Sequence, residues 1–176
     1  MYKRQEKTFS FTSNEEEPGV YRPAAPEDVL PERLYRLRIS APGWPIIAAE
    51  TFVPGRFQLV EANADTVQYQ SDEQLLLTVT RSAYPTRQSI LIFSTEALAP
   101  SFETMTPFYK DVSSEDDVES LRINESPLIN EGNYDVNPDG TLTIKLPWLA
   151  VVFYGPTRLT ASAIDDNLYD FCLLYT

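Results

Sequence analysis

Residues 134–154 read YDVNPDGTLTIKLPWLAVVFY, and their pattern predicts the fold class. It opens with the turn sequence Asn-Pro-Asp-Gly at 137–140, in which proline presets the first φ angle and glycine accepts the final, positive one. Over residues 141–146, leucine and isoleucine alternate with threonine and lysine, which predicts a half-buried strand. From 148 to 154 almost every residue is apolar, which predicts a strand covered on both faces. The stretch therefore predicts a β-hairpin in the core.

Similar patterns extend in both directions from this hairpin. Further strands are predicted over 33–40, 46–52, 57–61 with a continuation at 67–69, 75–80, 89–94, 158–164 and 168–175. For the first of these, a helix through Leu30, Leu34 and Leu37 is an alternative that Pro31 disfavours. Turn sequences separate them, including a predicted hairpin tip at 165–167. About ten short strands spaced roughly 8–12 residues apart are typical of an antiparallel β-sandwich or a jelly-roll-like barrel. One short helix is expected within 113–121, where serine caps the first turn and acids lie at its positive end.

Residues 1–31 are predicted to form an extended, proline-rich N-terminal arm, and residues 32–176 a single β-sandwich domain. Closely spaced prolines prevent a helix and favour extended backbone. The arm also contains several aromatic residues, whereas disordered tails are usually poor in them. We therefore expect the arm to lie on a surface, either of its own body or of a neighbouring subunit.

Composition excludes several classes of function. The chain has 26 acidic and 14 basic residues, a formal charge of −12, which disfavours nucleic acid as a partner. It contains no histidine, so the commonest general base near neutral pH and the commonest transition-metal ligand are absent. The single cysteine, Cys172, cannot form an internal disulfide and is expected to be a small buried hydrophobe. Thus no cofactor is predicted.

The N-terminal residues do not form the apolar segment of a signal peptide. The longest apolar run has about nine residues, whereas a membrane-spanning helix needs about 20. We therefore expect a non-secreted chain without a membrane partner, located in the cytoplasm or in a virion.

One short motif matches the start of a calcium loop. Asp135, Asn137 and Asp139 precede Gly140 with the spacing of the first EF-hand ligands. The twelfth position, however, is Leu146 in place of glutamate, and the flanks are predicted strands. These residues are a weak calcium candidate, and a hairpin turn explains them better. The acidic run at 115–119 is similarly expected to be a solvated helix start.

Aromatic residues in the arm and loops are the candidate contact residues. Trp44 lies in a Pro-Gly-Trp-Pro turn, where it is either exposed or packed over the end of its own sandwich. Tyr84 lies beside Pro85 at the apex of a loop, whereas Trp148 is expected in the core. Exposed aromatic residues in loops can stack on sugar rings or anchor a protein interface. The predicted interface residues are Tyr2, Phe9, Phe11, Tyr21, Trp44 and Tyr84.

No catalytic set is recognisable. The six glycines are too dispersed for a phosphate-binding loop, and without histidine a serine triad cannot form. We therefore expect a non-enzymatic, structural or interaction subunit of a homo-oligomer or larger protein assembly, of the kind found as capsid decoration, adaptor or tail proteins of virions. One alternative is a carbohydrate-binding β-sandwich module. A second is a glycosidase or lyase that uses two facing carboxylates.

Overall fold

The chain is mainly β-structure, as predicted. The computed structural model describes residues 8–14, 17–23, 28–85, 87–130 and 132–175. Strands account for 36% of the chain and helices for 14%, and the strands form four antiparallel, sandwich-like sheets. Contacts between residues divide the chain into two compact units, Met1–Leu30 and Pro31–Thr176.

In the unit Met1–Leu30 the described residues form a small hairpin. Its two strands are β1 (Phe11–Ser13) and β2 (Tyr21–Pro23), which pair antiparallel. The backbone N–H of Asn14 donates to Val20 and extends the pairing toward the turn. Because each strand has only three residues, the hairpin is at best marginally stable by itself.

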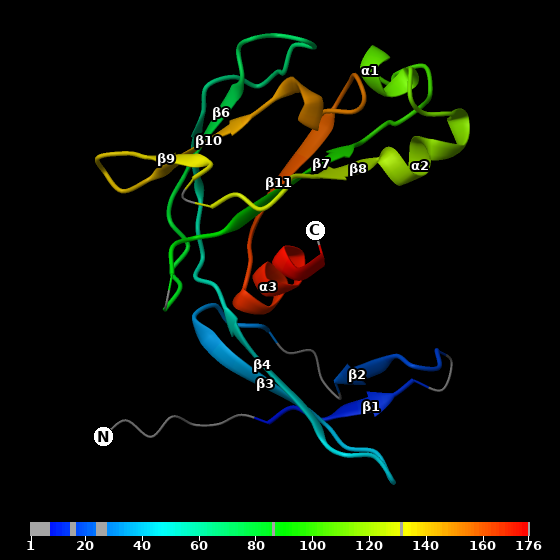
Figure 1. Cartoon of the computed structure of the whole chain (residues 1–176), viewed down its shortest axis with the longest axis vertical. Coiled ribbons are helices and arrows are strands. Elements are labelled where there is room, and N and C mark those ends of the chain that lie inside the picture. Colours follow the sequence, from blue (N-terminus) through cyan, green and yellow to red (C-terminus); the bar gives the residue numbers. More distant parts are fainter. Residues whose placement is uncertain (1–7, 15–16, 24–27, 86, 131, 176) are drawn as a thin grey trace. The chain divides into compact units, whose positions relative to one another are not determined.

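Three sheets make up the unit Pro31–Thr176 (Figure 1). The first has four strands in the order β5-β6-β10-β9, the second has three in the order β11-β7-β8, and the third is the pair β3-β4. The strands are β3 (Arg33–Ile39), β4 (Ile47–Val53), β5 (Leu59–Ala62), β6 (Leu75–Val79), β7 (Leu91–Ala97), β8 (Ile123–Glu125), β9 (Tyr134–Val136), β10 (Leu142–Leu146) and β11 (Thr157–Ala163). The helical segments are α1 (Pro107–Lys110), η1 (Glu115–Asp117), α2 (Val118–Leu121), η2 (Trp148–Ala150) and α3 (Asp166–Tyr175).

The main core lies between the two larger sheets. Its buried cluster combines side chains from β6, β9 and β10 with Leu91 and Phe93 of β7. In β10, Leu142, Ile144 and Leu146 are buried while the residues between them are not, so the alternation predicted over 141–146 is confirmed. The strands predicted over 75–80 and 89–94 also exist, but they belong to different sheets and face each other across this core.

The strand predicted over 148–154 is wrong. Trp148–Ala150 is a single 3-10 turn, in which Ala150 N–H donates to the Pro147 carbonyl. Val152 and Phe153 that follow are buried in a second core cluster with Met105, so the apolar run does fill a core. Proline lacks the N–H that would continue the β10 ladder, and this ends the strand at Leu146. Trp148 itself is half-buried rather than fully enclosed.

The strand predicted over 168–175 is also wrong, because this segment is helix α3. The Asp165 carboxylate accepts the backbone N–H of Leu168, and the Asp165 carbonyl accepts that of Tyr169. Asp165 is therefore the N-cap of a helix and not the tip of a hairpin. The half-buried residues Tyr169 and Cys172 lie three apart, the spacing of one helix face.

Two smaller predictions had different outcomes. The helix expected within 113–121 is present as η1 and α2, and both N–H and hydroxyl of Ser114 donate to the Asp117 carboxylate. The strand continuation at 67–69 is absent, since these residues have no ladder partner. None of the described helices is long and apolar enough to span a lipid bilayer.

Candidate functional site

The β3–β4 hairpin exposes many large apolar side chains to solvent. Within the described residues no third strand joins this sheet, and six of seven residues in β3 and four of seven in β4 are exposed. An isolated two-stranded hairpin is only marginally stable in water. Its large exposed apolar side chains are Leu34, Leu37, Ile39, Trp44, Ile46 and Ile47.

The strand register sorts these side chains onto two faces. Leu37 lies opposite Ala49 and Ile39 opposite Ile47, so the outer half of one face is entirely apolar. The other face contains Arg36, whose Nε lies 3.0 Å from Oε1 of Glu50 on the opposite strand. Since side chains alternate along a strand, the Arg-x-Arg pattern of β3 places its second arginine on this charged face as well.

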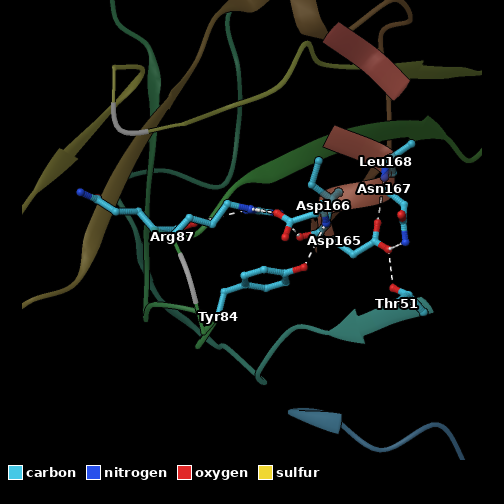
Figure 2. Close-up of polar contacts among 9 residues, drawn as sticks. Thr51, Tyr84, Arg87, Asp165, Asp166, Asn167 and Leu168 are labelled. Carbon is cyan, nitrogen blue, oxygen red and sulfur yellow. Dashed lines mark hydrogen bonds and ion pairs between the residues drawn. The ribbon is translucent and has the colours of Figure 1, made fainter. Parts of the chain in front are cut away.

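A polar cluster attaches the hairpin to helix α3 (Figure 2). The Asp165 carboxylate accepts hydrogen bonds from the Thr51 hydroxyl, from the Leu168 N–H at 2.9 Å and from the Asn167 amide at 3.0 Å. Asn167 also donates to the Glu50 carbonyl at 2.7 Å. Burial raises the pKa of Asp165, but these hydrogen bonds lower it by more, so its net shift is downward. Asp165 is therefore an anion that joins strand β4 to the start of α3.

Arg87 is the cation of the same cluster. Its Nε bonds the Asp166 carboxylate and its Nη2 donates to the Ile164 carbonyl at 3.1 Å. The guanidinium carbon lies 4.2 Å from the centre of the Tyr84 ring. The Arg87 side chain is only 17% exposed, so these contacts replace most of its hydration.

Tyr84 packs within its own chain instead of standing at an exposed loop apex. Its hydroxyl accepts the backbone N–H of Asp166 at 3.1 Å, and its ring meets that of Phe52 edge to face with centroids 5.4 Å apart. Burial is the main cause that raises the pKa of the Tyr84 hydroxyl. Tyr84 thus packs against the base of the hairpin through Phe52.

Sequence reasoning missed this cluster for two different reasons. The N-cap role of Asp165 had a local signal, an acid immediately before a helix-compatible segment. Arg87 and Thr51 had none, because their partners are 79 and 114 residues away in the chain.

The chemistry of these carboxylates suits binding and anchoring. Asp165 and Asp166 are directed to different donors rather than toward each other. Sugar hydrolysis needs a facing pair in which one carboxyl has a raised pKa. In the described part of the chain, the carboxyl groups with a shifted pKa all have it lowered: Glu96, Glu103, Asp117, Asp139 and Asp165.

Of the candidate calcium residues, Asp135 lies in strand β9, and Asn137 and Asp139 lie in the β9–β10 turn. Both the N–H and the hydroxyl of Thr141 donate to the Asp139 carboxylate, and the Asn137 amide donates to the hydroxyls of Thr141 and Thr143. Asp135 pairs with Lys145 across the hairpin at 3.1 Å. Across the residues that the structure describes, no group of three or more Asp, Glu, His or Cys side chains is placed to hold a metal ion.

The remaining predicted contact residues have different degrees of exposure. Trp44, at the tip of the β3–β4 hairpin, is 76% exposed, and Phe11 and Tyr21 on β1 and β2 are 54% and 64% exposed. Phe9 is half-buried, and Tyr2 lies outside the described residues. Of the predicted contact residues, the exposed ones thus lie on the β1–β2 and β3–β4 hairpins.

Comparison of the chain with protein-family models, with curated proteins and with solved structures gives no match.

Proposed function

We propose that this chain is a non-catalytic subunit of a larger protein assembly and that the β3–β4 hairpin docks on another protein subunit. The observation that carries the proposal is the apolar outer face of the hairpin. Leu37, Ile39 and Ile47 are 51%, 48% and 60% exposed there. Contiguous apolar surface of this kind marks interaction sites in soluble proteins.

The base of the hairpin is held in a defined position, which favours recognition. Thr51 and Phe52 contact the body through Asp165 and Tyr84. Anchoring of this kind reduces the conformational entropy that is lost on binding, compared with a free loop. Covering the exposed halves of three large aliphatic side chains contributes roughly 1 kcal/mol each to binding.

Charge indicates what the partner surface is like. Residues 31–53 contain three arginines and two glutamates (3 − 2 = +1), whereas residues 54–176 contain seven basic and eighteen acidic residues (7 − 18 = −11). The hairpin is therefore the least acidic part of this unit. A complementary partner presents an apolar groove for the outer face, with carboxylates at the rim that meet Arg36 and Arg38.

The test compares the native particle of the wild type with that of a hairpin variant. The double variant Leu37→Ser, Ile47→Ser removes two of the three large aliphatic side chains of the apolar face, and Val112→Ser is the matched control because Val112 is 72% exposed outside the hairpin. Particle mass and subunit stoichiometry are measured by light scattering and analytical ultracentrifugation. Loss of about 2 kcal/mol of binding is expected to raise the Kd of assembly about 30-fold in the double variant only.

Two results would refute the proposal. One is assembly of the double variant at wild-type strength while circular dichroism shows it folded. The other is a wild-type chain that stays monomeric at about 100 µM, a concentration that detects even weak interfaces, and copurifies with no stoichiometric partner. A particle of shell or tail size would support the finer proposal of a virion component.

A further inference from the structure

Strand β11 is an open edge of the body. It is the end strand of the sheet β11-β7-β8, beside β7 (Figure 1), and no described residue pairs with its outer side. It is seven residues long and contains no proline, glycine or bulge. Proteins usually protect such edges with charges, prolines or bulges, because unpaired backbone groups bind other strands.

The direction of the unpaired groups follows from the neighbouring ladder. In β7, the backbone groups of Leu91, Phe93 and Ala97 bond to the chain on the β8 side. Because peptide groups alternate in direction along a strand, the intervening residues of β7 bond to β11. The register pairs those residues with Arg158, Thr160 and Ser162.

The outward N–H and C=O groups of β11 therefore belong to Thr157, Leu159, Ala161 and Ala163. On the exposed face of the strand only Arg158 is charged, and its Nη1 already lies 2.9 Å from Glu96. Strand β5, an edge of the four-stranded sheet, is irregular, because its pairing with β6 shifts register between Leu59 and Glu61. Of these two edges, β11 is the one able to accept a long partner strand.

An apolar cavity opens beside this edge. It has a volume of about 300 Å³ and lies where β5 and β6 of one sheet face β7 and β11 of the other. All of its lining residues are apolar: Phe57, Leu59, Leu77, Val79, Phe93, Leu159 and Ala161. Leu59 at its side is 61% exposed, so the sandwich is open at this end.

We propose that β11 pairs antiparallel with β11 of a second copy of this chain, about a twofold axis through Thr160. This register is the only one in which all seven residues of both strands are paired. Leu159 then lies opposite Ala161 of the second copy, and the outward groups of both residues form hydrogen bonds. Opposed residues share a face of the sheet, so the apolar side chains of the second copy cover the mouth of the cavity.

Charge and symmetry both favour a second copy as the occupant. Arg158 lies opposite Ser162 of the second copy, and the two Arg158 residues are four positions, roughly 14 Å, apart. That separation exceeds the Debye length of about 8 Å at physiological ionic strength. A self-complementary edge is the requirement for a twofold dimer, the commonest closed oligomer. The dimer joins the two sheets in the order β8-β7-β11-β11-β7-β8.

The net charge of −12 on each copy predicts the salt dependence of the dimer. Long-range repulsion between the copies weakens association, and salt screens this repulsion. We expect the dimer to strengthen as salt is added. An interface held by ion pairs would weaken instead.

The test is a register-specific crosslink in the full chain, in a Cys172→Ser background. At Thr160 the two copies form a non-hydrogen-bonded pair, whose Cβ atoms are close enough for a disulfide. Thr160→Cys is expected to crosslink under mild oxidation about tenfold more than the control Arg158→Cys, whose cysteines would be too far apart to bond. Sedimentation of the uncrosslinked chain measures independently whether it is a dimer.

Equal crosslinking of the two cysteine variants, or a sedimentation profile of monomer alone, would overturn the β11 dimer. The interface goes beyond the hairpin site and does not depend on it. In the variant Leu37→Ser, Ile47→Ser the Thr160→Cys crosslink is therefore expected to persist, so failure of either proposal can be told from failure of the other. A wild-type dimer with the cavity filled by a small apolar molecule, and no crosslink at position 160, also rejects the β11 dimer.

Discussion

Replacement of Asp165 is the sharpest test of how the hairpin is held. The carboxylate caps α3 through the Leu168 N–H and bonds the Thr51 hydroxyl on β4. Loss of an N-cap costs about 1 kcal/mol, and loss of a charged acceptor for a partly buried hydroxyl about 1–2 kcal/mol. Asp165→Ala is therefore expected to lower the free energy of unfolding by about 2–3 kcal/mol, and the isosteric Asp165→Asn by about 1 kcal/mol.

Urea unfolding at pH 7 measures these differences, and thermal unfolding checks them. For a domain of this size 1 kcal/mol corresponds to roughly 2–4 °C in Tm. Asp170→Asn is the matched control, because this residue is exposed on the same helix. An Asp165→Asn variant as stable as the Asp170→Asn control would refute the structural role of the carboxylate.

The difference in unfolding free energy between the wild type and Asp165→Asn is expected to depend on pH, with a defined sign. Burial raises the pKa of Asp165, the hydrogen bonds lower it by more, and the folded-state pKa is below its ordinary value of 3.8. The group thus contributes stability at pH values above 3.8, and this contribution is lost as the pH falls through the folded-state pKa. The stability gap between wild type and Asp165→Asn should narrow on acidification below pH 3.8. A gap of constant size would show that the charge of Asp165 has no part in it.

Two further substitutions test the contacts around the base of the β3–β4 hairpin. Arg87→Met leaves Asp166 without its cation and is expected to lower the free energy of unfolding in urea by about 2–3 kcal/mol, less than for a fully buried pair because Asp166 is half exposed. Arg87→Lys should recover only part of this stability. An Arg87→Met variant as stable as the wild type would contradict the role of the ion pair. Gly55→Ala places a Cβ 2.8 Å from both the Cβ and the backbone nitrogen of Ala83, so we expect a cost of about 1–3 kcal/mol in thermal unfolding, with partial rescue by Ala83→Gly. An unchanged Tm in Gly55→Ala would show that this close approach is relieved without cost.

Strand alternation was readable wherever polar and apolar residues differ clearly. In β10 the buried leucines and isoleucine alternate with threonine and lysine, and β3 and β11 were also located from their own residues. This pattern is local, because neighbouring side chains on a strand point to opposite faces whatever the rest of the chain does. The mainly β fold could be predicted for that reason.

In segments with few polar residues, the pattern of side chains does not distinguish a helix from a strand. Residues 168–175 are compatible with either a strand or a helix, and the cap at Asp165 together with the contacts of Thr51 selects the helix. Residues 148–154 fill a core, as their composition indicates, but Pro147 and the second core cluster determine their path.

The residue pattern alone located a β-rich body with an apolar centre and a turn at 137–140. It left open whether Trp44 is exposed or packed on its own domain, and in the folded chain this side chain is 76% exposed. Which surfaces remain uncovered depends on how the elements pack in the folded chain. Tyr84 is half-buried against Phe52 and Arg87, whereas β11 is left as an edge because no other described strand reaches its outer side. Exposure depends on contacts between residues far apart in the chain, such as Thr51 and Asp165, which are 114 positions apart. Local side-chain patterns do not predict those contacts. The exposed face of the β3–β4 hairpin and the open edge of β11 could therefore be identified only in the folded chain.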